Sequence, residues 1–107
     1  MNLEYFKTQI RDELDGAKEY IEKAIESKIS HPSWSNCFVG MSDAEIEHAT
    51  KLMKMMEECM RKNRGLKTEE SSLTSSSTVN PETVYKDMMK EYGETMTYVT
   101  NMKRGLV

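Results

Sequence analysis

The stretch from Trp34 to Cys59, WSNCFVGMSDAEIEHATKLMKMMEEC, decides the fold of this chain. Alternating steps of four and three place side chains on one face of an α-helix. Residues at those steps form one stripe: Trp34, Phe38, Met41, Glu45, His48, Leu52, Met55 and Cys59. Pro32 suits the first helical turn, where its missing N–H costs nothing. The pattern therefore predicts a helix from about Pro32 to Lys62, with Ser42 as an alternative start.

A second helical stripe precedes this one, between Leu3 and Lys28. The stretch contains no proline, and its single glycine is Gly16. Small and apolar residues recur at helical spacing: Leu3, Phe6, Ile10, Ala17, Tyr20 and Ala24. Glu13 occupies a position of this stripe where packing against another helix requires an apolar residue. The two stripes together predict an antiparallel helical hairpin.

The register of the hairpin brings the polar members of the two stripes together. If the chain turns near Ser30, residues that lie level on antiparallel helices have numbers that sum to about 61. Glu13 then lies level with His48, and Glu45 lies one turn away. The other levels pair apolar side chains: Phe6 with Met55, Ile10 with Leu52, Tyr20 with Met41, and Ala24 with Phe38.

The C-terminal part predicts a third helix. Asn80 can cap a helix that has Pro81 in its first turn, and Gly105 marks its end. One face of this helix carries Tyr85, Met88, Tyr92, Thr95, Val99 and Met102. Residues 63–79 contain Gly65 and a Ser/Thr-rich run, which indicates a flexible linker. We therefore predict an all-α fold with a hairpin over residues 1–62, a linker over 63–79 and a C-terminal helix over 80–107.

The composition argues against several classes of function. The chain has 107 residues, of which 37% are hydrophobic and 31% charged, with a net charge of −3. It has no basic stripe for nucleic acid and no apolar run of the ~20 residues that span a bilayer. Two cysteines, Cys37 and Cys59, are too few for a disulfide scaffold, which favours a cytoplasmic protein. So short a chain gains apolar contact by forming a homo-oligomer.

The polar residues of the seam indicate a metal site. A carboxylate in an apolar seam costs several kcal/mol unless it is paired or bound to metal. Glu45 and His48 are three residues apart, so both project from one face of their helix. Carboxylate oxygen with imidazole nitrogen suits iron or manganese, and zinc is compatible. The predicted ligands are therefore Glu13, Glu45 and His48. They underfill a dinuclear site, but two chains supply four Glu and two His.

These residues resemble the ferritin-like superfamily, in particular its rubrerythrin-type and half-size encapsulated members. The likeness lies in Glu13 with Tyr20 seven residues on, and in Glu45-x-x-His48-Ala49, and it covers roughly residues 9 to 60. It implies a di-iron carboxylate protein with Tyr20 hydrogen-bonding near the metal. The function it implies is iron oxidation or storage, or peroxide handling, as a ferroxidase-type oxidoreductase. The implied fold is half of a four-helix bundle, completed by a homodimer or higher oligomer.

Another interpretation dispenses with the metal. Glu13 and His48 could form an ordinary ion pair within the hairpin, and the chain would then be a non-enzymatic helical interaction module. Its C-terminal helix would contact a protein partner. Most other acidic residues lie off the seam and fit a solvated face, with Glu22 as the one place where iron could enter. Cys59 fits packing better than nucleophilic chemistry, because no base accompanies it in either stripe.

Overall fold

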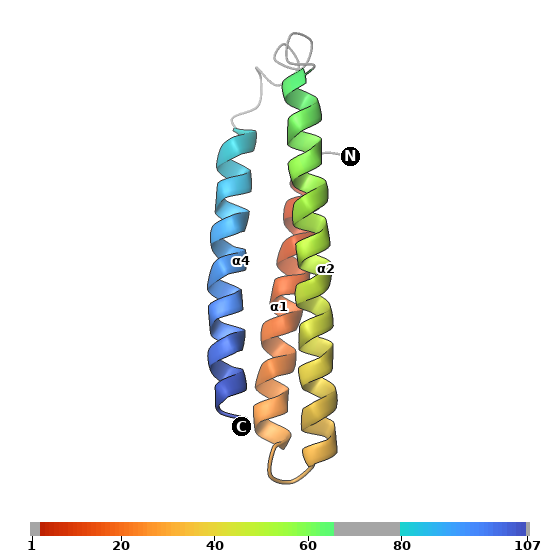
Figure 1. Cartoon of the computed structure of the whole chain (residues 1–107), viewed down its shortest axis with the longest axis vertical. Coiled ribbons are helices and arrows are strands. Elements are labelled where there is room, and N and C mark those ends of the chain that lie inside the picture. The colour runs from red at the N-terminus through yellow and green to blue at the C-terminus, as the bar shows by residue number, and fades with distance from the viewer. Residues whose placement is uncertain (1–2, 66–79, 107) are drawn as a thin grey trace.

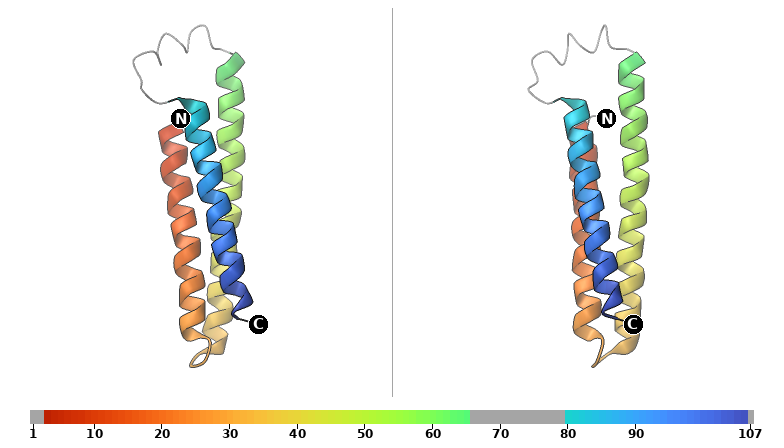
Figure 2. Two further views of the ribbon diagram at one scale, coloured as in Figure 1. Left: turned by 90° about the vertical axis from the view of Figure 1, so that its left-hand side faces the viewer. Right: turned by 60° about the vertical axis from the view of Figure 1, so that its left-hand side comes forward.

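The computed structural model describes residues 3–65 and 80–106, which form three α-helices. They are α1 (Leu3–Ser27), α2 (Pro32–Gly65) and α4 (Pro81–Arg104). α1 and α2 form an antiparallel hairpin, and α4 packs along it in the same direction as α1 (Figures 1 and 2). No strand occurs in these residues, so the predicted all-α fold is confirmed. None of the described helices is both long and apolar enough to cross a membrane.

The helices begin where local chemistry predicts. The Asn80 side chain accepts a hydrogen bond of 2.9 Å from the Glu82 N–H, and Pro81 occupies the first turn of α4. α2 begins at Pro32 and runs without a break through Ser42, so the alternative start is wrong. It continues to Gly65, which makes residues 63–65 helical rather than part of the expected linker. Residues 66–79, the rest of that linker, lie outside the described residues.

The hydrophobic core lies between all three helices. Its larger cluster contains Phe6, Ile10, Leu14, Ala49, Met53, Met56, Val84 and Met88. A smaller cluster towards the hairpin turn contains Ala17, Ile21, Ala24 and Val99. Because α4 supplies residues to both clusters, the chain forms a three-helix bundle rather than a bare hairpin.

Small residues allow α1 and α2 to approach closely between the middle of the hairpin and its turn. Ala17 and Ala24 of α1 are fully buried. The Ser42 hydroxyl donates to the Ala17 carbonyl oxygen, and the Ser35 hydroxyl donates to that of Ala24, each at 2.7 Å. Both serines are buried, and these bonds satisfy their hydroxyls. They also fix the register of the two helices.

The predicted core stripe of α2 is wrong by about one residue along the helix. The buried residues are Ser35, Ser42, Ala49, Met53, Met56 and Met60. Three members of the predicted stripe, Trp34, Met41 and Met55, are instead 55%, 42% and 46% exposed. The reason is α4, which contacts α2 as well as α1. A helix that packs against two neighbours buries the face between them, and this face is rotated away from the one that would face α1 alone.

Candidate metal centre

Glu13, Glu45 and His48 come together on the surface of the hairpin. One ligand atom from each of the three side chains lies within 4.8 Å of the others. α1 supplies Glu13, and α2 supplies Glu45 and His48 from successive turns. The predicted register therefore holds at this level of the hairpin, although Met41 and Met55 of the same predicted stripe are exposed.

Gly16 makes room for one of these ligands. A Cβ atom at Gly16 would lie 2.7 Å from Glu45 Oε2 and 3.3 Å from Glu45 Cδ. The Glu45 carboxylate therefore rests against the backbone of α1, where any larger residue would displace it. The Ser42–Ala17 hydrogen bond, one turn away on α2, holds the two backbones at the distance that this contact requires.

One oxygen atom of the Glu13 carboxylate lacks a hydrogen-bond partner. This atom, Oε2, is buried and accepts no hydrogen bond. The nearest cationic group is His48 Nδ1 at 3.4 Å, which is an ion-pair distance and is too long for a good hydrogen bond. His48 itself is 54% exposed, so this pair is only partly shielded from water. A buried, unpartnered carboxylate oxygen is costly, and a cation would satisfy it.

The two carboxyl groups also disturb each other. Burial raises the pKa of Glu45 from 4.5 to about 7, assisted by the close approach and the negative charge of the Glu13 carboxylate. The charge of His48 lowers the pKa of Glu45, but by less. Near neutral pH the pair of carboxyl groups therefore tends to hold a proton. A divalent cation would take the place of that proton.

The predicted role of Tyr20 remains a prediction. Its ring stacks on that of Phe38, with centroids 6.2 Å apart and an interplanar angle of 21°. Both rings lie on the side of the Glu13, Glu45 and His48 cluster that faces the hairpin turn. The stack continues the apolar surface next to Glu13 and Glu45.

The acidic residues assigned to the solvated face form their own surface pairs. Glu47 lies 3.4 Å from Lys51, and Glu57 lies 3.6 Å from Arg61. Glu22 accepts a hydrogen bond from the Tyr98 hydroxyl of α4. None of these three belongs to the cluster of Glu13, Glu45 and His48. Glu22 connects α1 to α4, and its expected role as an entry point for iron stays a prediction.

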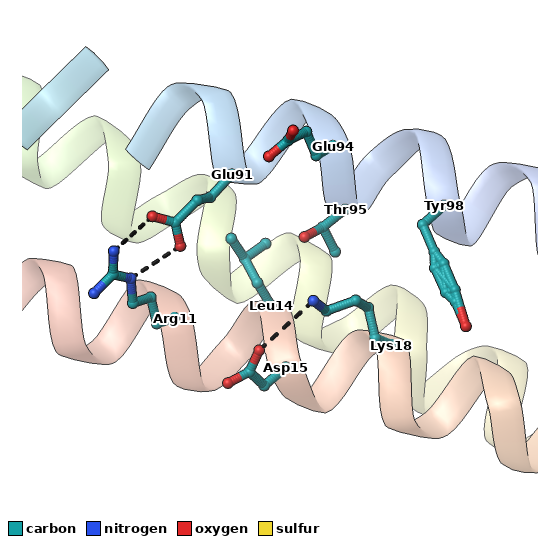
Figure 3. Close-up of a pocket in the computed structure, with 8 residues that line it drawn as sticks. All are labelled: Arg11, Leu14, Asp15, Lys18, Glu91, Glu94, Thr95 and Tyr98. Carbon is teal, nitrogen blue, oxygen red and sulfur yellow. Dashed lines mark hydrogen bonds and ion pairs between the residues drawn. The ribbon is translucent and has the colours of Figure 1, made fainter. Parts of the chain in front are cut away.

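A groove lies between α1 and α4 (Figure 3). It has a volume of about 360 Å³ and is lined by Arg11, Leu14, Asp15, Lys18, Glu91, Glu94, Thr95 and Tyr98. Its charged groups largely neutralise one another, because Arg11 donates two hydrogen bonds to Glu91 and Lys18 lies 3.8 Å from Asp15. The paired charges across this groove thus stabilise the packing of α4 on α1.

Gly16 and Ser42 shape the candidate centre, although the sequence pattern marks Gly16 only as a lone glycine and Ser42 only as a possible helix start. Both in fact serve the close approach of α1 and α2. The signal that could have found them is the row of small residues on both helices, because small side chains at facing positions allow short interaxial distances.

Comparison of the chain with models of known protein families, with curated proteins and with solved structures gives no match.

Proposed function

We propose that this protein binds iron through Glu13, Glu45 and His48, as half of a dinuclear carboxylate centre. The observation that carries the proposal is the buried Glu13 Oε2 atom, which has no hydrogen-bond partner and lies beside two further ligand atoms. Two carboxylates and an imidazole are a donor set that iron accepts, as do manganese and zinc. The residues present therefore fit the metal.

The alternative of a plain ion pair accounts for less of the cluster. One imidazolium can neutralise one carboxylate, and His48 is more than half exposed. The second carboxylate would remain uncompensated beside the first, and this is reflected in the raised pKa of Glu45. A divalent cation would balance both carboxylates and leave the imidazole neutral as a ligand.

Two chains would complete the ligand set. One chain offers three ligands, whereas a pair of chains offers four Glu and two His, the set described for ferritin-like bundles. A bound iron pair would supply one-electron redox chemistry towards dioxygen or peroxide. The protein would hold the ligands in position: Gly16 admits the Glu45 carboxylate, and the Ser42 hydrogen bond keeps α1 and α2 together.

A second function, that of a helical interaction module without metal, is favoured by a different observation. Trp34, Met41 and Met55 expose large apolar surfaces along α2. Exposed apolar side chains in one region are typical of protein interaction surfaces. This function needs no metal, so metal binding distinguishes the two proposals.

The decisive experiment is titration of the metal-free protein with ferrous ion under anaerobic conditions, followed by calorimetry and metal analysis. The wild-type chain should bind one iron per chain, and Glu45→Ala should abolish binding. Glu47→Ala is the matched control, because Glu47 has the same charge on the same helix but pairs with Lys51 at the surface. Absence of binding by the wild type, or equal loss in both variants, would leave the interaction module as the better account.

A further inference from the structure

α2 carries two parallel rows of side chains at the spacing of a coiled-coil seam. The core row contains Ser35, Ser42, Ala49 and Met56, each seven residues from the next. The outward row, one residue earlier in each heptad, contains Trp34, Phe38, Met41, Glu45, His48, Leu52, Met55 and Cys59. Steps of four and three repeated over more than three heptads are typical of a helix that packs along another helix. Only the core row is fully used within the chain.

α4 occupies the other side of α2. The hydroxyl groups of Thr50 and Tyr92 are 2.7 Å apart, and Glu57 accepts a hydrogen bond from Tyr85. Lys103 of α4 pairs with Asp43. At 100° per residue, these α2 positions lie at least about 120° around the helix from Trp34, Met41 and Met55. The outward row therefore remains accessible when α4 is in place.

The outward row concentrates the exposed apolar surface of the molecule. Within residues 3–65 and 80–106, six large hydrophobic residues are exposed, and three of them are Trp34, Met41 and Met55. Leu52, Phe38 and Cys59 are partly buried against the core and extend the same strip. Apolar residues that extend on both sides of Glu45 and His48 in this way indicate a surface that a partner covers.

The order of residues along the row identifies the partner. From either end, three apolar residues lead to one polar residue, so the row is symmetric about a point between Ile46 and Glu47. We infer that a second copy of this chain docks on the row in antiparallel orientation, about a two-fold axis through that point. The levels of the interface are then Trp34 with the partner's Cys59, Phe38 with the partner's Met55, Met41 with the partner's Leu52, and Glu45 with the partner's His48.

The polar middle of the row selects the antiparallel orientation. Glu45 and the partner's His48 are of opposite character, and the two-fold axis repeats this favourable pair. A parallel arrangement would place Glu45 against the partner's Glu45, where two carboxylates repel each other. The row is therefore complementary to itself in one direction only. This property points to a copy of the same chain rather than to an unrelated apolar partner.

The size of the contact agrees with a stable dimer. The row from Trp34 to Cys59 is roughly 38 Å long at ~1.5 Å per residue, and two adjacent helices are about 20 Å wide. The face of the hairpin that carries the row thus covers roughly 750 Å² per chain, close to the ~800 Å² per partner of ordinary protein interfaces. α1 contributes Glu13 and Tyr20 to the same face.

This inference deepens the proposed function and rests on it only where metal is concerned. The two-fold axis crosses α2 beside Glu45 and His48, so the ligands of the two chains meet in the middle of the interface. The apolar levels on both sides would exclude water from that centre. The contact itself follows from the apolar and polar order of the row, whether or not metal is bound.

Disulfide trapping tests the orientation. In a Cys37→Ser background, Trp34→Cys should give a covalent dimer through Cys59 of the partner on mild oxidation, seen on a non-reducing gel and mapped by mass spectrometry. Positions 34 and 59 are about 38 Å apart along one helix, so they cannot bond within a chain. Cys37→Ser alone should not give a covalent dimer, and neither should Cys37→Ser with Met89→Cys, which places a thiol at an exposed site on α4.

A charge substitution tests the surface itself. Met55→Glu should weaken dimerisation at least tenfold in sedimentation equilibrium, because it places a carboxylate against the partner's Phe38. Met89→Glu is the matched control, since Met89 is 51% exposed and lies on α4, and its dimerisation should equal that of the wild type. Circular dichroism establishes that both variants fold.

The outcomes separate this inference from the proposed metal binding. A wild-type chain that binds ferrous ion but stays monomeric with and without it overturns the inference and leaves metal binding intact. A covalent dimer of Cys37→Ser alone, through Cys59 of both chains, overturns the antiparallel orientation. The antiparallel disulfide in a protein that binds no iron supports the inference and removes the metal proposal.

Discussion

Replacement of Gly16 by alanine should raise the stability of the metal-free protein and lower its affinity for ferrous ion. A glycine in a helix interior costs ~1 kcal/mol relative to alanine. Gly40 in α2 and Gly93 in α4 have no atom within 4 Å of the position that a Cβ would occupy. Gly40→Ala and Gly93→Ala should therefore each raise the free energy of unfolding by up to ~1 kcal/mol, or the melting temperature by roughly 4–8 °C.

Gly16→Ala should give a similar gain in stability but lose the metal. The new Cβ would lie 2.7 Å from Glu45 Oε2, and an ordinary contact begins at 3.4 Å, so the carboxylate must retreat by about 0.7 Å. That atom is the end of a flexible side chain, and its movement costs the fold little. Metal–ligand distances tolerate only about 0.2 Å, so affinity for ferrous ion should fall at least ~10-fold.

Thermal melts of the three metal-free variants, with anaerobic calorimetry of each, provide the measurement. Gly40→Ala is the matched control, because it changes helix propensity on the same hairpin without touching a ligand. Wild-type affinity in Gly16→Ala would refute the role of the Glu45 carboxylate as a ligand in its present position. A Gly16→Ala variant more than ~1 kcal/mol less stable than Gly40→Ala would show that the carboxylate cannot retreat.

Two further predictions concern the hairpin. Ser42→Ala removes the buried hydrogen bond to the Ala17 carbonyl oxygen and should cost ~1 kcal/mol in chemical denaturation; an unchanged denaturation midpoint would contradict this. The metal-free protein should lose roughly 1–3 kcal/mol of stability between pH 4.5 and pH 7, because the folded state, in which the pKa of Glu45 is about 7, holds a proton that the unfolded chain releases at lower pH. Glu45→Gln should flatten that part of the stability profile, and a profile identical to that of the wild type would show that another group controls it.

The parts of this fold that the sequence predicts are those set by local chemistry or by a single register. Asn80 and Pro81 specify the start of α4 without reference to any other helix, and Pro32 does so for α2. The meeting of Glu13 with His48 follows from the position of the turn and the rise per residue. Each of these predictions depends on neighbouring residues or on one distance along the chain.

Local chemistry and register do not reveal which of the two rows of α2 faces the core. Both rows repeat at heptad spacing, and the outward row is the more apolar of the two at Trp34 and Met41. The core row uses Ser35 and Ser42, which a hydrophobic pattern does not select. Their burial depends on backbone carbonyl groups of α1 that accept their hydroxyls and on α4, whose position the sequence of α2 does not contain.

The division of α2 into two faces explains why a costly polar cluster can persist in this fold. The core of α1, α2 and α4 closes without Glu13, Glu45 or His48, because these side chains belong to the outward row and its surroundings. The single chain therefore gains nothing from a carboxyl group whose pKa is raised by burial and by a like-charged neighbour. The two proposed interactions would compensate for it at one place. A divalent cation would balance the carboxylates, and a second copy would cover the apolar residues on either side of them.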